Sequence, residues 1–467
     1  MGAQSWTVLE WLALAEHELL LFAGIFFLLG ALDELAMDLA WFWLRLTRRV
    51  QTFTLARADL RHRHLGGRAA VLIPAWQEAS VIDETLRHAL AVWPNRQLRI
   101  YVGVYRNDPA SLEAAARGAA GDPRVRIVVH DRDGPSTKAD CLNRLYKAMQ
   151  QDELREGCPV RMVVLHDAED MVDPAALPLL DRAIDDAQFV QLPVLPLPQH
   201  KSRWVGSHYC EEFAEAHGKA MVVRNALGAS LPAAGVGCAF DRRLLAEMAR
   251  DMGADAPFDE ESLTEDYELG IKVAMLGGKS QFLRVRGEDG QLIATRAWFP
   301  ADLGKAVRQK ARWMHGIALQ GWDRLGWTGG PGEWWMRLRD RRGPLSALVL
   351  LTGYTLFVLA MVLAALNLAG FGHPWQPSGL LLTLLALNAA SFLWRAFMRF
   401  TFTRAEYGWR EGLRAMLRIP VANVIAIMAG HRALLAYGRT LRGEAPKWEK
   451  TAHDAHPARR IDVEWAQ

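Results

Sequence analysis

The chain has 467 residues, 51% of them hydrophobic, and a formal net charge of +3. A mean hydropathy near zero is too apolar for a wholly soluble chain of this length, and so small a charge gives no reason to expect a nucleic-acid partner. The four cysteines are scattered without a Cys-x-x-Cys spacing, which predicts neither a zinc site nor a disulfide framework.

The amino-terminal stretch predicts one membrane helix. Residues 1–18 carry acids but no Lys or Arg, which argues against a secretory signal peptide. The apolar run 19–44 follows, and at about 1.5 Å per residue it is long enough to cross a hydrocarbon core. Arginines then crowd the linker 45–67, so the positive-inside rule places this end in the cytoplasm and residues 1–18 outside.

Three acids, Asp33, Glu34 and Asp38, fall in the inner half of this apolar run. A charge at that depth is costly unless it faces protein or water, and two interpretations are open. The helix can tilt so that the acids lie near the inner membrane interface. Alternatively, the acids make polar contacts with the domain that follows.

Between about Arg68 and Asp302, short apolar strands alternate with helical stretches, which predicts βαβ units and a mostly parallel α/β sheet. The expected strands are 69–73, 98–104, 125–129 and 162–165. Helices are expected to begin near Ser80, Ser111 and Thr137, with Ser80 capping the first of them.

The strand at 162–165 ends in a group of carboxylates, Asp167, Glu169 and Asp170. Open α/β sheets bind ligands beyond the carboxyl ends of their strands. Three acids within four residues repel one another unless a cation or solvent screens them. The residues alone leave two alternatives, a divalent-metal site and a solvated acidic turn.

Polar residues also follow the other strands of this domain. The first strand runs into Glu78 and the second into Asp108, so both loops should lie beside the carboxylates. Lys138 and Asp140 open the helix near 137, where a lysine can face an anionic ligand or simply the solvent. The small residues at 235–238 allow the backbone to approach a ligand closely.

Two downstream clusters are candidates for chemistry. Glu265 and Asp266 lie at a helix start, either as an acidic bias of the helix amino end or as a base near a sugar hydroxyl. Gln309, Arg312 and Trp313 share one helix face, where an arginine beside an aromatic ring suits a diphosphate and a stacked sugar. The same helix also fits an amphipathic segment leading to the membrane.

The ordered motifs PAWQE, ND, TKADCLN, DAED, TED and QKARW resemble the processive family 2 glycosyltransferases, over about residues 68–321. The form HDAED and the sequence WEKTAH at 448–453 are most similar to the phage adsorption protein B group of bacterial inner-membrane members. The carboxy-terminal regulatory domain usual in that group is expected to be absent. The resemblance implies an α/β fold, a GT-A-type mostly parallel sheet domain inserted between transmembrane helices.

The resemblance also implies roles for individual residues. Asp167 and Glu169 match the DxD motif that holds Mg²⁺ or Mn²⁺ on the donor diphosphate, with Asp170 as a substitute ligand. Asp266 matches the general base of TED, with Glu265 beside it. The expected substrate-binding residues are Asp108 and Lys138 at the nucleotide, Gln309, Arg312 and Trp313 around the acceptor sugar and diphosphate, and in addition Glu78 and Asp140. Asn107 departs from the acid expected before Asp108.

The carboxy-terminal part predicts further membrane contacts. Tryptophans make 322–344 an interfacial segment, and the runs 345–371 and 379–397 are two more membrane helices with arginines on their cytoplasmic flanks. The stretch 413–438 is predicted to be an interfacial helix, with a fourth span as the alternative. Residues 439–467 are expected to form a cytoplasmic tail, of which 452–467 is polar and mobile.

These features together predict a multi-pass enzyme of the bacterial inner membrane with its catalytic domain in the cytoplasm. We expect an inverting glycosyltransferase that moves a hexosyl or N-acetylhexosaminyl group from a UDP-sugar onto a growing polysaccharide, coupled to export through an outer-membrane partner. The other expected partners are the nucleotide-sugar donor, a glycan or lipid-linked acceptor and membrane lipid. Single-sugar transfer to a lipid carrier and a non-catalytic membrane receptor or scaffold are the alternatives.

Overall fold

The computed structural model describes residues 8–61, 63–370, 378–444 and 455–458. The loop between the second and third predicted spans, the WEKTAH sequence at 448–453 and most of the polar tail lie outside the described residues.

A seven-stranded, mostly parallel sheet forms the centre of the α/β domain, in the order β4-β3-β2-β5-β8-β6-β9. The four strands expected from the sequence are present and parallel to one another: β2 (Arg68–Pro74), β3 (Leu98–Tyr105), β4 (Val125–His130) and β5 (Val160–Leu165). The remaining strands are β6 (Phe189–Gln191), β8 (Cys238–Asp241), which is antiparallel to β5 and β6, and β9 (Ser280–Phe282). The predicted α/β fold is confirmed.

Helices cover both faces of this sheet, which explains why β2 and β5 carry consecutive buried apolar residues rather than one at every second position. Successive residues of β2 point to opposite faces of the sheet. Val71 lies in the core with α3 (Ile82–Val92), α4 (Pro109–Ala119) and α6 (Ala176–Ala183). Leu72 faces the other way, toward α5 (Lys138–Glu156) and α9 (Arg242–Asp251).

The helix starts follow the sequence expectations with one correction. Thr137 caps α5 by accepting a hydrogen bond from the Asp140 backbone N–H at 3.1 Å, and Asp108 caps α4. Ser80 does not cap α3, whose N-cap is Val81 without a side-chain cap. The reason is that the carbonyl of Glu78 already accepts the N–H groups of Val81 and Ile82 at 3.0 Å each, and this closes the turn.

Short strands and a helical layer connect the sheet to the membrane helices. Two small parallel pairs are β1 (Phe53–Leu55) with β10 (Val285–Gly287) and β7 (Val194–Pro196) with β11 (Thr295–Ala297). The helical elements are α2 (Arg57–Arg61), η1 (His200–Ser202), α7 (His208–Glu215), η2 (Ala216–Ala220), α8 (Met221–Ala226), α10 (Glu265–Met275), α11 (Leu303–Trp313), η3 (Met314–Gln320), α12 (Gly321–Leu325) and α13 (Pro331–Arg341).

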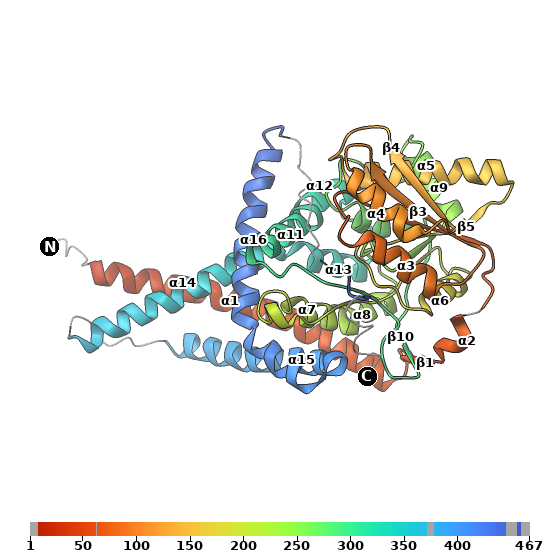
Figure 1. Cartoon of the computed structure of the whole chain (residues 1–467). Coiled ribbons are helices and arrows are strands. Elements are labelled where there is room, and N and C mark those ends of the chain that lie inside the picture. The colour runs from red at the N-terminus through yellow and green to blue at the C-terminus, as the bar shows by residue number, and fades with distance from the viewer. Residues whose placement is uncertain (1–7, 62, 371–377, 445–454, 459–467) are drawn as a thin grey trace.

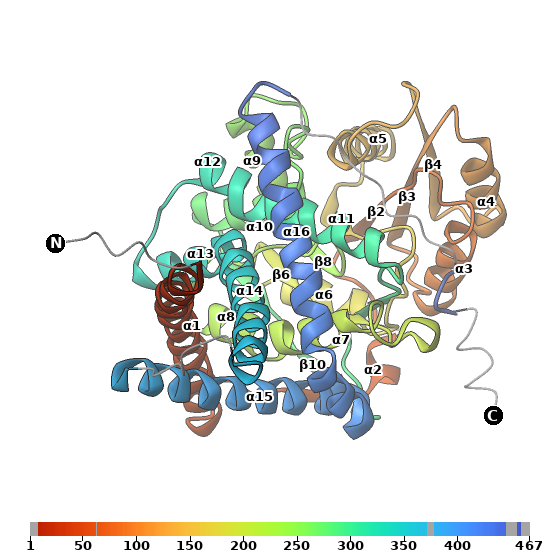
Figure 2. The same ribbon diagram turned by 90° about the vertical axis from the view of Figure 1, so that its left-hand side faces the viewer.

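Among the described residues, four helices are long and apolar enough to cross a membrane: α1 (Val8–Leu46), α14 (Gly343–Leu368), α15 (Gly379–Leu417) and α16 (Ile419–Thr440). In Figures 1 and 2, α1, α14 and α15 lie on one side of the molecule and the sheet on the other. Helix α15 continues well past the predicted end at 397 and bends at Gly408, whose φ is +81°.

Helix α16 packs against α11 of the α/β domain. Ala429 and Ala433 are buried with Ala311 of α11, and the Tyr437 hydroxyl donates to Asp323 Oδ2 at 2.7 Å. Farther on, part of the tail is docked rather than mobile. The buried His456 places its Nε2 atom 3.1 Å from the carbonyl oxygen of Asp170.

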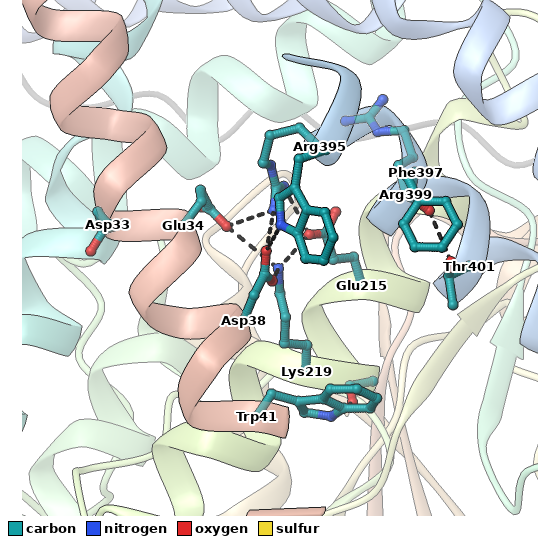
Figure 3. A network of polar contacts seen from close by, with 12 residues as sticks. Asp33, Glu34, Asp38, Trp41, Glu215, Lys219, Arg395, Phe397, Arg399 and Thr401 are labelled. Carbon is teal, nitrogen blue, oxygen red and sulfur yellow. Dashed lines mark hydrogen bonds and ion pairs between the residues drawn. The ribbon is translucent and has the colours of Figure 1, made fainter. Parts of the chain in front are cut away.

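The three acids of α1 contact other parts of the protein, as the second interpretation of the sequence requires. Asp38 is 0% exposed, pairs with Lys219 of η2, and accepts a hydrogen bond from the Trp394 indole at 2.8 Å. Asp33 and Glu34 each form ion pairs with Arg339 and Arg342. Figure 3 shows how Glu34 and Asp38 converge with Lys219 on one network.

Candidate active site

A cavity of about 660 Å³ lies beyond the carboxyl end of β5, between the sheet, α10, α11 and the membrane helices. It gathers eight of the twelve residues predicted for the site. These are Lys138, Asp167, Glu169, Asp170, Asp266, Gln309, Arg312 and Trp313. Motifs that are far apart in the sequence therefore face one shared space.

Lys138 and Asp167 meet at the wall formed by β5 and α5. The lysine Nζ lies 2.5 Å from Asp167 Oδ1. Burial on its own would lower the pKa of Lys138, but the charges of Asp167, Glu265 and Asp266 outweigh it and hold this pKa above its usual range. The lysine thus stays cationic at the start of α5, where an anionic ligand is favoured.

Asp170 has a different environment from Asp167. Its Oδ2 atom accepts hydrogen bonds from His166 Nδ1 at 2.8 Å and from the Asp167 backbone N–H at 3.0 Å, and the residue is 2% exposed. Burial raises its pKa. This carboxylate therefore holds the loop in shape, whereas Asp167 and Glu169 line the cavity beside it.

The donor set fits a metal that is shared with a substrate. Within residues 8–61, 63–370, 378–444 and 455–458, no group of three or more His, Cys, Asp or Glu side chains is arranged to hold a metal by itself. Mg²⁺ is commonly bound by one or two carboxylates together with substrate phosphates and water. Asp167 and Glu169 match that arrangement, so they could hold Mg²⁺ or Mn²⁺ against a diphosphate.

Glu265 and Asp266 form the first turn of α10. Burial, followed by the charge of Asp266, raises the pKa of Glu265 to about 7. Burial also raises the pKa of Asp266, whose Oδ1 accepts the backbone N–H of Tyr267 at 2.7 Å. A buried acid with a raised pKa at the edge of a cavity is suited to take up a proton near neutral pH.

Gly235 lies directly against the Asp266 carboxylate. A Cβ atom at this position would stand 2.2 Å from Asp266 Oδ2, and the φ of Gly235 is +74°. Only glycine meets both conditions without strain. The close backbone approach expected at 235–238 is present, and at Gly235 the group approached is the carboxylate of Asp266.

The opposite wall carries the cluster Gln309, Arg312 and Trp313 of α11. Gln309 Oε1 and Arg312 Nε are buried and have no hydrogen-bond partner in the described part of the chain. Such atoms are rare in native proteins, and they suit a polar ligand. The Trp313 ring packs edge-on against Phe213 and Phe299, each at a centroid distance of 6.4 Å.

The other four predicted residues, Glu265, Asp108, Asp140 and Glu78, do not line this cavity. Asp108 Oδ2 accepts the backbone N–H of Gln77 at 2.6 Å, which joins the ends of β2 and β3. Asp140 Oδ2 lies 3.1 Å from His130 Nε2 at the end of β4. Glu78 is buried beside Ser111, whose hydroxyl accepts the Glu78 backbone N–H at 2.8 Å.

Sequence reasoning missed one wall of the cavity, the segment α7–η2. It contributes Glu212, Phe213, Glu215, His217 and Lys219. The turn Ala216–Ala220 is π-helical, a distortion that is frequent at functional sites. The only sequence pattern here is the Glu215–Lys219 pair at i, i+4 spacing, which is typical of an exposed helix face.

The mostly parallel α/β domain, its acidic loop after β5 and its buried acid on α10 define a GT-A-type glycosyltransferase domain in a membrane protein. A family model described as "Glycosyltransferase like family 2" matches residues 67–316, which is more than half of the chain. The chain therefore belongs to this family, as its motifs predict.

The relatives agree with this assignment. The chain is 32% identical over 459 residues to bacteriophage adsorption protein B of Escherichia coli K12 and, to the same extent, to bacteriophage N4 adsorption protein B of Escherichia coli O157:H7. These matches cover 92% of this chain, which spans 61% of the length of either relative. The predicted resemblance to this group is confirmed.

A solved structure shares the fold. It is a mannosyltransferase from Pyrobaculum calidifontis in complex with GDP-Man and Mn²⁺. The likeness covers 91% of this chain and 99% of that one, with a TM-score of 0.53 and 19% sequence identity. At this identity the likeness shows the fold, and the chemistry has to be argued from the residues of the present chain.

Proposed function

We propose that the protein is an inverting glycosyltransferase that moves a sugar from a nucleotide-diphosphate donor, a UDP-sugar, onto a growing polysaccharide. One observation carries this proposal. Asp266, a half-buried acid, shares a single cavity with the acidic loop Asp167–Glu169 and with Arg312, a cation that forms no ion pair with any described residue. A base, a diphosphate site and a leaving-group cation are what a one-step sugar transfer needs.

In this proposal the donor lies across the ends of β2, β3 and β5. Asp108, Glu78 and Asp140 hold the nucleotide side, and Lys138 pairs with its phosphates. Asp167 and Glu169 are the residues for Mg²⁺ or Mn²⁺, which when bound would neutralise charge on the diphosphate.

Asp266 then acts on the acceptor. It accepts the proton of an acceptor hydroxyl while that oxygen attacks the anomeric carbon, and the bond from this carbon to the diphosphate oxygen breaks. Arg312 stabilises the negative charge that develops on the departing diphosphate, while Trp313 and Gln309 hold the acceptor sugar. The configuration inverts because there is a single displacement without a covalent enzyme intermediate.

We further propose the bacterial inner membrane as the location, with the α/β domain in the cytoplasm and export of the product through an outer-membrane partner. The arginines at 45–67 and 337–342, on either side of this domain, support the orientation. The packing of α16 on α11, together with the contact of His456 with Asp170, supports an interfacial α16 and three spans.

A panel of nucleotide sugars tests the proposal. The full chain in detergent, supplied with Mn²⁺ and each donor, should release nucleoside diphosphate from one or a few of them, and the product should form a ladder on a gel. Calorimetry with Mn²⁺ and UDP serves as the companion measurement. Absence of both binding and release would favour a non-catalytic scaffold and would contradict the proposal.

A second candidate is the transfer of a single sugar to a lipid carrier. It is favoured by the reach of the cavity, which extends to Glu34 of α1 and Arg395 of α15. A lipid-linked monosaccharide gives one band on a gel and never a ladder, so the same assay separates the two candidates.

A further inference from the structure

The cavity continues past Asp266 to the place where the membrane helices meet the α/β domain. Its far end is lined by charged residues from five elements. They are Glu34 of α1, Glu212 of α7, Glu215 of α7, Lys219 of η2, Arg339 of α13, Arg342 after α13, and Arg395 and Arg399 of α15. None of these belongs to the motifs that suggested the sugar-transfer site.

Most of these charges neutralise one another. Lys219, which is 1% exposed, pairs with Asp38 at 2.5 Å and with Glu215 at 2.7 Å. Arg395 pairs with Glu215 at 2.8 Å and with Glu34 at 2.9 Å. With the pairs of Asp33 and Glu34 to Arg339 and Arg342, four acids face four bases. This set, seen in part in Figure 3, is balanced.

Arg399 is the exception. It lies one helical turn after Arg395 on α15 and lines the same cavity. Its Nη1 atom is buried without a hydrogen-bond partner, and no carboxylate of a described residue forms an ion pair with it. In Figure 3 no dashed line reaches its guanidinium group.

Two acids of α7 feel the charge of Arg399, but both form ion pairs with other cations. Glu211 forms an ion pair with Arg418 at 2.8 Å, and Glu212 pairs with Lys310. Arg399 contributes to the electrostatics of both acids without pairing with either. The membrane end of the cavity thus carries one positive charge in excess.

A guanidinium is a planar fork of N–H donors that matches a phosphate, and a partly buried charge is costly until an anion pairs with it. Arg399 follows the apolar run 379–397 directly, so it lies where α15 leaves the hydrocarbon core, at the depth of lipid headgroups. An anion that enters from the lipid side reaches this position first.

We propose that Arg399 binds the phosphate group of a lipid-linked acceptor, whose sugar hydroxyl extends along the cavity to Asp266. This inference rests on the proposed function and narrows the acceptor to a lipid-linked glycan. The phosphate stays at the membrane end and takes no part in bond formation. Arg399 is accordingly a binding residue for the acceptor and does not touch the reacting atoms.

Binding to the full chain in detergent, without donor or metal, tests this proposal. The probes are a polyprenyl phosphate, the matching polyprenol without phosphate, and inorganic phosphate. Wild type should bind the polyprenyl phosphate more tightly than the polyprenol. Arg399→Gln should lower the affinity for polyprenyl phosphate on the order of 10- to 100-fold, which is the loss expected for one charged hydrogen-bonded pair. The affinity for the polyprenol should stay unchanged. Arg404→Gln, an exposed arginine of the same helix, is the matched control.

Equal affinity of Arg399→Gln and wild type for polyprenyl phosphate would overturn the proposal, as would equal affinity of wild type for the phosphate and the polyprenol. If inorganic phosphate displaces the probe at the concentration at which the probe itself binds, the site takes free phosphate and the lipid assignment is wrong. Retained binding of UDP with Mn²⁺ verifies that the variant is folded.

If Arg399→Gln fails to fold, Arg399→Lys tests the proposal instead, because it keeps the positive charge and loses the paired N–H donors of the guanidinium. Wild-type affinity for polyprenyl phosphate in that variant would overturn bidentate binding at Arg399. Because no donor is present, failure of sugar transfer would overturn the proposed function and leave this binding result unaffected.

Discussion

The Nζ atom of Lys219 lies 2.5 Å from Oδ1 of Asp38, and both side chains are buried. The pair joins η2, a wall of the cavity, to the membrane helix α1. Figure 3 shows that Glu215 and Arg395 extend this link to α7 and α15. The shape of the cavity therefore depends on how the membrane helices are placed.

This pair predicts a stability effect. Lys219→Met removes the nearest cation of the buried Asp38 carboxylate and leaves it Arg395 at 4.0 Å, and breaking a buried ion pair on one side costs about 3–5 kcal/mol. Melting in detergent should show a large loss of stability for Lys219→Met. The double variant Asp38→Asn/Lys219→Met, in which neither charge of the pair remains, should recover part of that stability. Glu18→Gln, an exposed acid of α1, is the control. A double variant no more stable than Lys219→Met would contradict the account.

Substitution of Gly235 should affect turnover through Asp266, beyond the effect of backbone strain alone. Gly235→Ala and Gly228→Ala both put an alanine at positive φ, +74° and +66°, which costs about 1–2 kcal/mol in either case. Only at Gly235 does the new Cβ meet the Asp266 carboxylate, since nothing lies within 4 Å at Gly228. Turnover should fall sharply for Gly235→Ala and change little for Gly228→Ala. Similar turnover in the two variants would show that Gly235 does not position Asp266.

The acidic loop predicts that its carboxylates act differently. Asp167→Asn and Glu169→Gln should weaken Mn²⁺-dependent binding of UDP in calorimetry with little effect on melting. Asp170→Asn should instead lower stability by about 1–3 kcal/mol, because a neutral amide oxygen is a weaker acceptor than the carboxylate for His166 Nδ1 and the Asp167 N–H. The assignment is wrong if Asp170→Asn abolishes metal-dependent binding while its melting temperature stays at the wild-type value.

Much of the fold follows from the sequence, and the reasons are local. Strands β2 to β5 are continuous apolar runs bounded by polar loops, and the caps Asp108 and Thr137 act within their own turns. Ser80 failed as a cap because a backbone carbonyl two residues earlier closes that turn.

The rest depends on contacts between distant parts of the chain. No spacing within HDAED indicates which acid turns inward, since this is decided by His166 and by the fold of the loop. The sequence of α7–η2 predicts an ordinary helix, because its role as a cavity wall depends on the pairing of Lys219 with Asp38, about 180 residues earlier. Asp33 and Glu34 of α1 are likewise explained by Arg339, some 300 residues later.

Glu265 predicts a dependence of stability on pH. Its pKa is about 7 in the folded protein against an ordinary value of 4.5, so the folded state binds more protons between these values. The free energy of unfolding should therefore fall as pH rises from about 4.5 to about 7, and Glu265→Gln should remove this part of the slope. Melting across this pH range checks it, and an unchanged slope in Glu265→Gln would contradict the assignment.

The most direct test of the proposed chemistry is release of nucleoside diphosphate by Asp266→Asn, compared with wild type at saturating donor and acceptor. Loss of the base should slow turnover by about 10²- to 10⁴-fold while the affinity for UDP with Mn²⁺ is retained. Asp255→Asn, an acid exposed at the surface, should turn over at the wild-type rate. Turnover by Asp266→Asn at the wild-type rate would contradict the assignment of Asp266 as the base.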